Sequence, residues 1–301
     1  MSKVTIMIPT YNQENYIKDA ITSALNQTYS NLEVIVCDDC SNDNTWDVIC
    51  SFKDKRLKTY KNEQNIGRVA NYRKLLYELS NGDYVINLDG DDYFTDNKYI
   101  EKAMNLIKRN NLDLVFANQY VGNKPTKMQL NTIIDGNWLF LNYGKNNIHI
   151  PHLTALYNRK KALELNFYSK DIISSDWESI LRFIVNSKIG FINTPVGVWR
   201  QIRQSESKSR NIEIYFKNID TLIESINSYC ITYFTKNELN KWNKRIIKNL
   251  LLDINHCTIF NNLQSYIKFI KNNNYVGLRD ILINKRFIKK LIAGIFACVA
   301  S

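Results

Sequence analysis

Eleven residues decide how this sequence is interpreted: Gly82-Asp83-Tyr84-Val85-Ile86-Asn87-Leu88-Asp89-Gly90-Asp91-Asp92. Residues 84–88 form a short apolar run bounded by turn residues, which predicts a buried strand of a parallel sheet. Three carboxylates follow within four residues, and they repel one another unless solvent, basic side chains or a metal ion offsets their charge. Open α/β sheets bind ligands outside the carboxyl ends of their strands, so these acids could hold a cation that bridges to a phosphate.

The same acids are also compatible with a simple surface turn, in which Asp and Gly are present for turn chemistry alone. The stretch by itself leaves these two interpretations open. A calcium-binding EF-hand loop does not fit. Its glycine belongs at the sixth loop position and a Glu at the twelfth, whereas Gly90 directly follows the first acid.

The sequence before the acids alternates between apolar strands and amphipathic helices. Strands are predicted at 4–8, 32–37, 57–60 and 84–88, and helices at 17–25, 46–52 and 67–79. Asn12 is predicted to cap the first helix, and Asp43 or Asn44 the second. This β-α-β-α-β-α-β order predicts parallel strands joined by right-handed crossovers.

The alternation becomes irregular after the acids. A helix with Thr95 or Asp96 as its cap is followed by a strand at 112–117, and residues 118–150 are irregular apart from a short helix at 138–143. Further elements are predicted as a strand at 152–157, a helix from Arg159, an amphipathic segment at 176–185, and strands at 189–192 and 196–199. We predict one α/β domain over residues 1–210, with halves at 1–120 and 121–210, and a helical appendage over 211–301.

Composition narrows the possible partners and compartment. The 301 residues carry a formal charge of +11, and residues 211–301 hold thirteen Lys/Arg against six Asp/Glu. A basic excess of this kind suits a nucleic acid, a membrane surface or anionic substrates. The six cysteines lack disulfide-scaffold spacing and the N-terminus lacks a leader pattern, so we expect a reducing cytoplasm. Cys37 and Cys40 form a CxxC without a second pair, which favours free thiols over a metal site.

A second pair of acids follows the strand at 32–37, where Asp38 and Asp39 are expected at the same sheet edge as the first group. The first strand ends there too, in Pro9-Thr10-Tyr11-Asn12. Neither the G-x-G-x-x-G nor the G-x-x-x-x-G-K-[ST] motif is present. A site built from acids would hold a diphosphate through a divalent metal, Mg²⁺ or Mn²⁺.

These residues resemble a bacterial family 2 glycosyltransferase with the GT-A nucleotide-sugar fold. The resemblance rests on four segments in order, residues 4–12, 33–45, 65–67 and 82–92. It is strong over about the first 120 residues and weaker to about Ser209. It implies a Rossmann-like, mostly parallel sheet flanked by helices, and a nucleotide-sugar donor.

The resemblance also implies roles for individual residues. Those surrounding the nucleotide base would be Pro9, Thr10, Tyr11 and Asp39, with Asp39 accepting a hydrogen bond from a ring N–H. Asp89 would hold the ribose or a metal-bound water, Asp91 the metal, and Asp92 would support them. Arg68 could reach the base or a phosphate, or could simply open a helix in solvent.

The family places a general base at the start of a later helix, commonly in a Glu-Asp pair before an aromatic residue. The corresponding segment here is Ser174-Ser175-Asp176-Trp177-Glu178, so Ser175 replaces the first acid and Asp176 is the expected base. The alternative role for Asp176 is a helix N-cap. Many relatives carry Arg-x-His after a late strand, whereas this chain has Trp199-Arg200-Gln201-Ile202-Arg203. Arg200 and Arg203 could therefore contact the diphosphate directly.

Two further features bear on the reaction. The Gln-x-x-Arg-Trp motif of processive synthases is absent, which favours transfer of a single sugar. His149 and His152 precede the predicted strand on the acceptor side, where a polar wall role is expected more often than a catalytic one.

The resulting expectation is inverting, metal-dependent transfer from a nucleotide diphosphate-sugar, with uridine as the default base. The acceptor would be a hydroxyl of a glycan or lipid-linked precursor of a surface polysaccharide, such as O-antigen, capsule or lipopolysaccharide. A nucleotidyltransferase is an alternative, but it would carry a glycine-rich basic loop after the first strand. A non-catalytic basic nucleic-acid-binding protein is another, and it predicts aromatic residues interleaved with a basic patch. We expect no nucleic-acid partner.

The end of the chain combines an apolar stripe with lysines. Residues 291–300 are too few to cross a bilayer, which needs about twenty. The stripe consists of Phe287, Ile288, Leu291, Ile292, Ile295, Phe296 and Val299, flanked by Lys285, Arg286, Lys289 and Lys290. This pattern predicts an interfacial helix over 285–301 at an anionic membrane, at the inner face of the cytoplasmic membrane; a final helix packed on the appendage explains it almost equally well.

Overall fold

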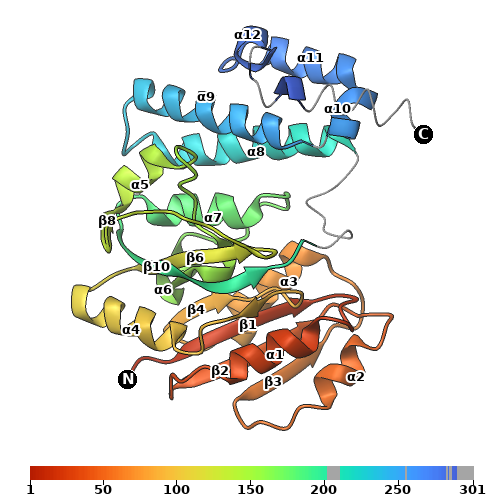
Figure 1. Ribbon diagram of the computed structural model, residues 1–301, viewed down its shortest axis with the longest axis vertical. Helices are drawn as coiled ribbons and strands as arrows, with labels where there is room; N and C mark the ends of the chain where they lie inside the picture. The colour runs from red at the N-terminus through yellow and green to blue at the C-terminus, as the bar shows by residue number, and fades with distance from the viewer. Residues whose placement is uncertain (202–210, 255, 283, 285–286, 290–301) are drawn as a thin grey trace. The chain divides into compact units, whose positions relative to one another are not determined.

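The computed structural model describes residues 1–201, 211–254, 256–282, 284 and 287–289 (Figure 1). The chain forms two compact units. The first contains residues 1–140, 147–171 and 175–201. The second contains residues 141–146, 172–174 and the described part of 202–301.

The first unit begins with four parallel strands. They are β1 (Val4–Thr10), β2 (Leu32–Asp38), β3 (Leu57–Lys61) and β4 (Tyr84–Asn87), in the order β3-β2-β1-β4. The intervening helices are α1 (Ile17–Leu25), α2 (Thr45–Cys50) and α3 (Arg68–Lys74), and α3 continues into the π-helical turn η1 (Leu75–Leu79). Every residue of β1 and β2 is buried, as expected for central strands of a parallel sheet. The predicted β-α-β-α-β-α-β order is confirmed.

The other half of the sheet departs from chain order. Its strands are β9 (Leu156–Asn158), antiparallel to both β4 and β6 (Leu114–Val121), and β10 (Lys188–Trp199), parallel to β6. Three short antiparallel strands complete it, namely β5 (Tyr93–Phe94) and β8 (Ile133–Asp135) beside β10, and β7 (Lys124–Pro125) beside β6. The sheet is therefore mixed rather than wholly parallel.

Two strand predictions in this half were wrong in detail. The predicted strands at 189–192 and 196–199 form one strand, β10, whose pairing with β6 shifts register on either side of Pro195. Proline cannot donate to a ladder, so an irregularity there accommodates it. The predicted strand at 152–157 begins instead with the 3₁₀ turn η2 (His152–Thr154).

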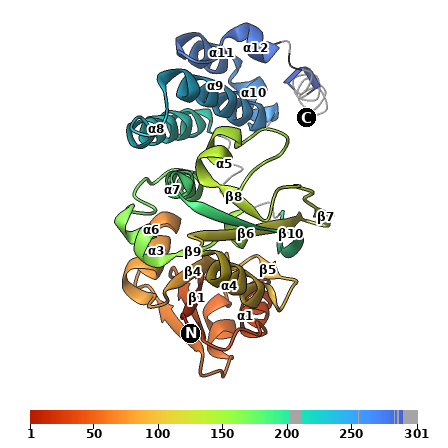
Figure 2. The same cartoon turned by 90° about the vertical axis from the view of Figure 1, so that its left-hand side faces the viewer.

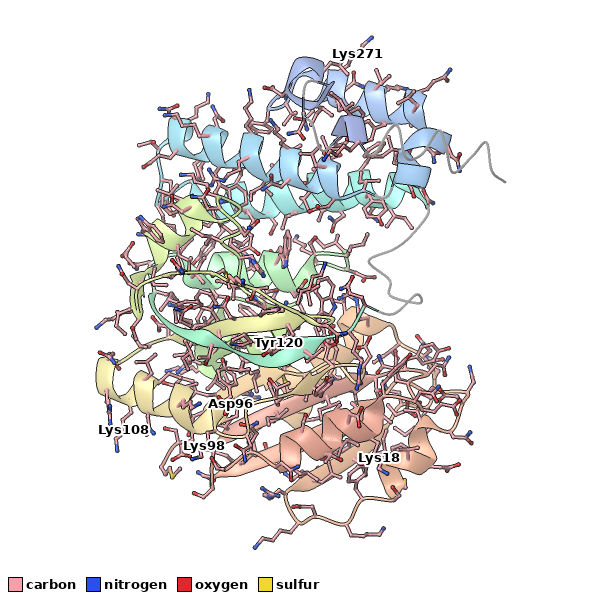
Figure 3. The ribbon with its side chains drawn as sticks, viewed as in Figure 1. Lys18, Asp96, Lys98, Lys108, Tyr120 and Lys271 are labelled. Atoms are coloured by element: carbon pink, nitrogen blue, oxygen red, sulfur yellow. The ribbon has the colours of Figure 1, made fainter. Side chains whose placement is uncertain are left out.

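The remaining helices of this half are α4 (Tyr99–Asn110), α5 (Gly136–Asn142), α6 (Arg159–Glu164) and α7 (Ser175–Ile184). Figure 2 shows α1 and α4 on one side of the sheet and α3, α6 and α7 on the other. Helix α4 buries one face, including Ile100, Met104 and Ile107, in the core. Lys98, just before the helix, and Lys108 are exposed at its two ends (Figure 3).

Two helix caps differ from prediction, and that of α2 agrees with it in position. Helix α1 begins at Ile17 without a side-chain cap, and Asn12 lies further back with a φ of 53°. Asn44 occupies the N-cap of α2 without a capping bond; Asp43 Oδ1 accepts from Thr45 N at 3.0 Å. Lys98, rather than Thr95 or Asp96, precedes α4.

The second unit is helical. Its helices are α8 (Ile212–Cys230), α9 (Lys236–Asp253), α10 (His256–Asn261), α11 (Leu263–Asn272) and α12 (Leu278–Leu282). Thr235 and Glu238 form a capping box at the start of α9. Within the ranges described here, no helix has the length and apolar character needed to cross a bilayer.

The predicted membrane segment lies mostly outside the described residues. Of residues 285–301, only 287–289 are described. Phe287 is buried and its ring stacks on Tyr266 at 5.7 Å, so its assignment to the membrane-facing stripe was wrong. Ile288 is exposed, as that stripe requires.

Candidate active site

The turn after β4 is drawn against the end of β1. Gly90 N donates to Pro9 O at 3.1 Å, and Leu88 N donates to Met7 O at 2.9 Å. A Cβ at Gly90 would lie 2.8 Å from Thr10 Oγ1 and still closer to Gln13 Oε1, which is inside normal contact distance. Glycine is therefore required for the acidic turn, residues 89–92, to approach the residues predicted to bind the nucleotide.

Asp39, at the end of β2, fastens the turn that precedes α3. Its Oδ1 accepts from Asn62 Nδ2 at 2.7 Å and from Ile66 N at 2.9 Å, and its Oδ2 accepts from Gly67 N at 2.9 Å. Gly67 has a φ of 91°, a conformation that favours glycine. Asp39 N in turn donates to Thr10 O at 2.9 Å, which joins this turn to the end of β1.

Asp38 lies inside the fold rather than at the ligand edge. It is fully buried and accepts hydrogen bonds from Ser41 N and Ser41 Oγ. Burial raises the pKa of Asp38, although the bonds from Ser41 oppose the shift. The prediction that both acids of this pair face the ligand was therefore wrong for Asp38.

The residues predicted beside the nucleotide base take different positions. Pro9 and Thr10 are buried at the end of β1, whereas the Tyr11 side chain is 41% exposed. Arg68 is the first residue of α3, and its guanidinium lies 5.4 Å from the centre of the Tyr72 ring. An exposed aromatic ring can stack on a planar base, and a guanidinium can contact a phosphate, so each of these two residues by itself suits a nucleotide.

The acidic turn concentrates negative charge. Asp91 is partly buried, and burial followed by the charge of Asp89 raises its pKa to about 6. Asp92 is buried, and burial followed by the charges of Asp91 and Asp89 raises its pKa well above the usual value. The turn is thus poised to gain from a cation.

Arg200 forms two hydrogen bonds to the acidic turn. Its backbone N donates to Asp92 Oδ1 at 2.9 Å, and its Nη1 donates to Asp91 O at 3.1 Å. The guanidinium also pairs with Asp19 and lies 4.5 Å from the centre of the Tyr93 ring. These contacts make Arg200 part of the support of the turn. Arg203, the other predicted diphosphate contact, lies outside the described residues.

Asp176 is the predicted general base. It lies in the first turn of α7, partly buried, and Glu178 and Arg182 anchor that helix with a buried ion pair at 2.6 Å. Burial, then the charge of Asp89 and also that of Asp176, raises the pKa of Tyr72. The charges of the predicted base, Asp176, and of Asp89 in the acidic turn therefore both act on Tyr72.

His149 and His152 each form a hydrogen bond to another group of the protein. His152 Nε2 is 2.9 Å from Tyr168 Oη, and its ring lies 5.6 Å from that of Tyr72. His149 bonds to Asn147 O at 2.8 Å, and burial lowers its pKa. These contacts are compatible with the polar, non-catalytic role expected for both histidines.

Sequence reasoning missed Tyr72, Gln13 and Tyr168. Tyr72 follows Arg68 by four residues, so it lies on the same helix face as a predicted site residue. That spacing was the available signal. Gln13 and Tyr168 come from loops whose position depends on tertiary contacts.

The donor set at the turn fits a divalent metal that shares its coordination with a substrate. Across the described ranges, no group of three or more His, Cys, Asp or Glu side chains is arranged to hold a metal. Asp89 and Asp91 supply two carboxylates, and Mg²⁺ is commonly bound through one or two carboxylates plus substrate phosphates. The residues present therefore fit a metal completed by the diphosphate.

Comparison with known sequences identifies the family of this chain. A family profile described as "Glycosyl transferase family 2" matches residues 5–167. The chain is 36% identical over 121 residues to the UDP-Glc:alpha-D-GlcNAc-diphosphoundecaprenol beta-1,3-glucosyltransferase WfaP of Escherichia coli, covering 40% of this chain and 47% of WfaP. It thus spans about half the length of that relative. A glycosyltransferase of Haemophilus influenzae is 27% identical over 324 residues, covering 97% of both chains.

Solved structures with the same architecture include two sugar-nucleotide complexes. TarS of S. aureus in complex with UDP-GlcNAc superposes with a TM-score of 0.72 at 17% identity, covering 89% of this chain and 79% of that one. The mannosyltransferase PcManGT of Pyrobaculum calidifontis, in complex with GDP-Man and Mn²⁺, gives 0.60 at 15% identity, covering 99% and 81%. At these identities the likeness concerns the fold alone, and it confirms the predicted GT-A fold.

Proposed function

The chain belongs to glycosyl transferase family 2, and from that premise we propose that it transfers a single sugar, with inversion, from a UDP-sugar to an acceptor hydroxyl. The observation that carries this proposal is the arrangement of Asp89, which accepts a hydrogen bond from the buried Tyr72 at 2.9 Å, of Asp91 in the same turn, and of Asp176 in the first turn of α7, whose charge also acts on Tyr72. Two of these carboxylates suit the donor, and the third suits the acceptor.

Donor binding is proposed for the edge formed by β1, β2 and β4. The exposed ring of Tyr11 would lie against the base, and Pro9, Thr10 and Asp39 would form the wall beside it. The Asp39 oxygens already accept bonds from the chain, and an additional bond from a ring N–H would use a remaining lone pair. Uridine is supported by the name of WfaP and by the UDP-GlcNAc complex of TarS.

Asp91 and Asp89 would hold a divalent metal, Mn²⁺ or Mg²⁺. When bound, the metal supplies charge stabilisation for the departing diphosphate. Arg200 keeps the turn in place through Asp91 O and Asp92. Arg203 is the proposed direct contact to the diphosphate.

Asp176 is proposed as the general base. Its carboxylate takes the proton from the acceptor hydroxyl while that oxygen bonds to the anomeric carbon, and the bond to the diphosphate oxygen breaks with its electron pair on the diphosphate. A single displacement of this kind inverts the anomeric centre. Roughly two to four decades of rate are typical of a positioned base.

The acceptor is proposed to be a lipid-linked or surface-polysaccharide precursor at the cytoplasmic face of the membrane. The support is the printed name of WfaP, which acts on a GlcNAc-diphosphoundecaprenol. Residues 285–301 would then contact anionic lipids. Binding to anionic vesicles that weakens with salt and is lost on deletion of 285–301 would support this contact, and equal binding by a folded truncated protein would refute it.

A panel of nucleotide-sugars tests the proposed function. We expect nucleoside diphosphate release with one UDP-sugar in the presence of Mn²⁺ and an acceptor. Melting curves with UDP, GDP, CDP and dTDP identify the base, since a ligand at a hundred times its Kd adds about 2.7 kcal/mol. Pyrophosphate formation from a sugar phosphate would indicate the nucleotidyltransferase instead, and nucleic-acid binding without turnover would indicate the basic binding protein.

A further inference from the structure

The Asp89 carboxylate is held on one side only. Its Oδ1 accepts from Tyr72 Oη at 2.9 Å and from Asn87 Nδ2 at 2.8 Å. Its Oδ2 accepts no hydrogen bond from any residue that the structure describes. Two donors on one oxygen fix the direction in which the other oxygen faces.

Tyr72 is suited to fixing that direction. It is 2% exposed, and its ring packs 5.1 Å from Tyr168 and 5.6 Å from His152. A phenolic O–H beside a carboxylate donates to it, so Tyr72 Oη is the donor and the Asp89 oxygen the acceptor. A packed ring with a protonated hydroxyl gives Asp89 a fixed partner.

Asn87 makes the second bond to Asp89, and its own side-chain oxygen is left buried without a donor among the described residues. It is fully buried at the end of β4, and its Oδ1 accepts no hydrogen bond from the part of the chain that is described. A buried acceptor without a donor is unfavourable, and a leucine of similar size would avoid it. An apolar side chain at this position could not donate a hydrogen bond to Asp89, whereas Asn87 Nδ2 does.

We propose that Tyr72 and Asn87 are positioning residues that hold Asp89 with Oδ2 directed at the nucleotide-sugar donor, on its ribose or its metal-bound diphosphate. The inference rests on the proposed function, because it supposes a donor at this edge.

The first test removes one hydroxyl. Tyr72→Phe should weaken Mn²⁺-dependent UDP binding about tenfold, which corresponds to about 1.4 kcal/mol. Tyr157→Phe is the matched control, because that hydroxyl is also buried but bonds to Tyr168 at 3.1 Å. The control should bind UDP within about twofold of the wild type. A crystal structure of Tyr72→Phe should show the Asp89 carboxylate rotated, and an unrotated carboxylate with unchanged affinity overturns the proposal.

A second variant separates positioning from folding. Asn87→Leu removes both the bond to Asp89 and the unpaired acceptor, so it should weaken Mn²⁺-dependent UDP binding while the Tm stays equal or rises. A merely structural Asn87 would show the opposite, a lower Tm with unchanged affinity. This variant also carries the test if Tyr72→Phe does not fold.

The two levels of the proposal fail differently. If the wild type binds none of the four nucleoside diphosphates with Mn²⁺ and consumes no nucleotide-sugar, the proposed function fails and the inference fails with it. If the wild type binds UDP and turns over while both variants bind as it does, only the positioning role is overturned.

Discussion

The end of β2 and the turn after β4 lie at the same edge of one sheet, and both carry adjacent acids, yet their carboxylates are used differently. At the end of β2 the chain itself supplies donors, since three hydrogen bonds reach Asp39 and Ser41 bonds to Asp38. In the acidic turn, one Asp89 oxygen accepts no bond from the described part of the chain, and Asp91 faces like charge.

This difference separates stability from function. A hydrogen bond to a charged group contributes about 1.5–3 kcal/mol, whereas neighbouring like charges oppose folding. Carboxylates that accept several hydrogen bonds from the chain should therefore stabilise it, even where, as at Asp39, a remaining lone pair is proposed to bind the base. Substitutions at the end of β2 should lower stability, whereas substitutions in the acidic turn should lower activity without lowering stability.

The largest effect is expected at Asp176, whose carboxylate accepts no hydrogen bond from the residues that the structure describes. Asp176→Asn should lower turnover by roughly two to four decades while UDP affinity and Tm stay near wild type, because the amide cannot take a proton. Initial rates and UDP titrations on the same preparation measure this. The exposed Asp171 gives the control Asp171→Asn. A variant at 176 that keeps most of its activity places the base elsewhere.

Next in size is the acidic turn itself. Asp91→Ala should abolish Mn²⁺-dependent UDP binding, which calorimetry can follow, without lowering the Tm, because it removes a partly buried charge that repels Asp89 and Asp92. The control is Asp47→Ala, at an exposed position in α2. Unchanged Mn²⁺-dependent affinity would remove Asp91 from the metal site.

At the end of β2 the effect should fall on stability. Asp39→Asn turns one acceptor oxygen into a donor facing the backbone N–H groups of Ile66 and Gly67, and should cost about 1–3 kcal/mol in the free energy of unfolding. Urea titration measures it, with Asp91→Asn as the matched variant in the other turn. Equal destabilisation by both variants would contradict the claim that Asp39 contributes more to stability than Asp91.

The smallest effect is a pH dependence at Glu33, another carboxylate that accepts several hydrogen bonds from the chain. Burial opposes its charge, but bonds from Lys3, Thr5 and Lys58 hold the pKa of Glu33 below its usual value. Because the folded pKa is the lower one, its stabilisation is present above about pH 4.3 and is lost as the pH falls through the folded pKa.

Glu33→Gln should therefore lower the Tm by about 2–4 °C at pH 7, corresponding to roughly 1 kcal/mol. The difference from wild type should shrink on acidification toward pH 3. A difference that grows at low pH would contradict the assignment of this carboxylate as stabilising.

The donor half of the fold could be predicted because its acids directly follow apolar strands. Parallel strands end at one edge, so Thr10, Asp39 and Asp89 could be placed together without knowledge of distant contacts. Capping could not be predicted as well. Asn12 has the right residue type for a cap, but its Oδ1 accepts from Asn42 N at 2.8 Å, so a loop contact replaces the helix role.

The other half depends on contacts between distant segments. Strand β9 inserts between β4 and β6 although it follows both in the chain, and no local pattern gives that order. The bond between Tyr72 and Asp89 likewise joins a helix to a strand end across the core. Spacing along the sequence could indicate Asp176 as a candidate but could not show that Tyr72 bonds to Asp89.

The place of Arg200 in the chain bears on how the protein is made. The four parallel strands are complete by Asn87, whereas the backbone N–H that bonds to Asp92 belongs to Arg200, 108 residues after Asp92. Domains fold from the N-terminus as the ribosome releases them, so the strands can pair well before β10 emerges. During synthesis, the acidic turn therefore acquires its final support only after the rest of its half has formed. A nascent chain that stops before Arg200 would contain the four parallel strands, but the acidic turn at its proposed donor-binding edge would lack the two hydrogen bonds from Arg200.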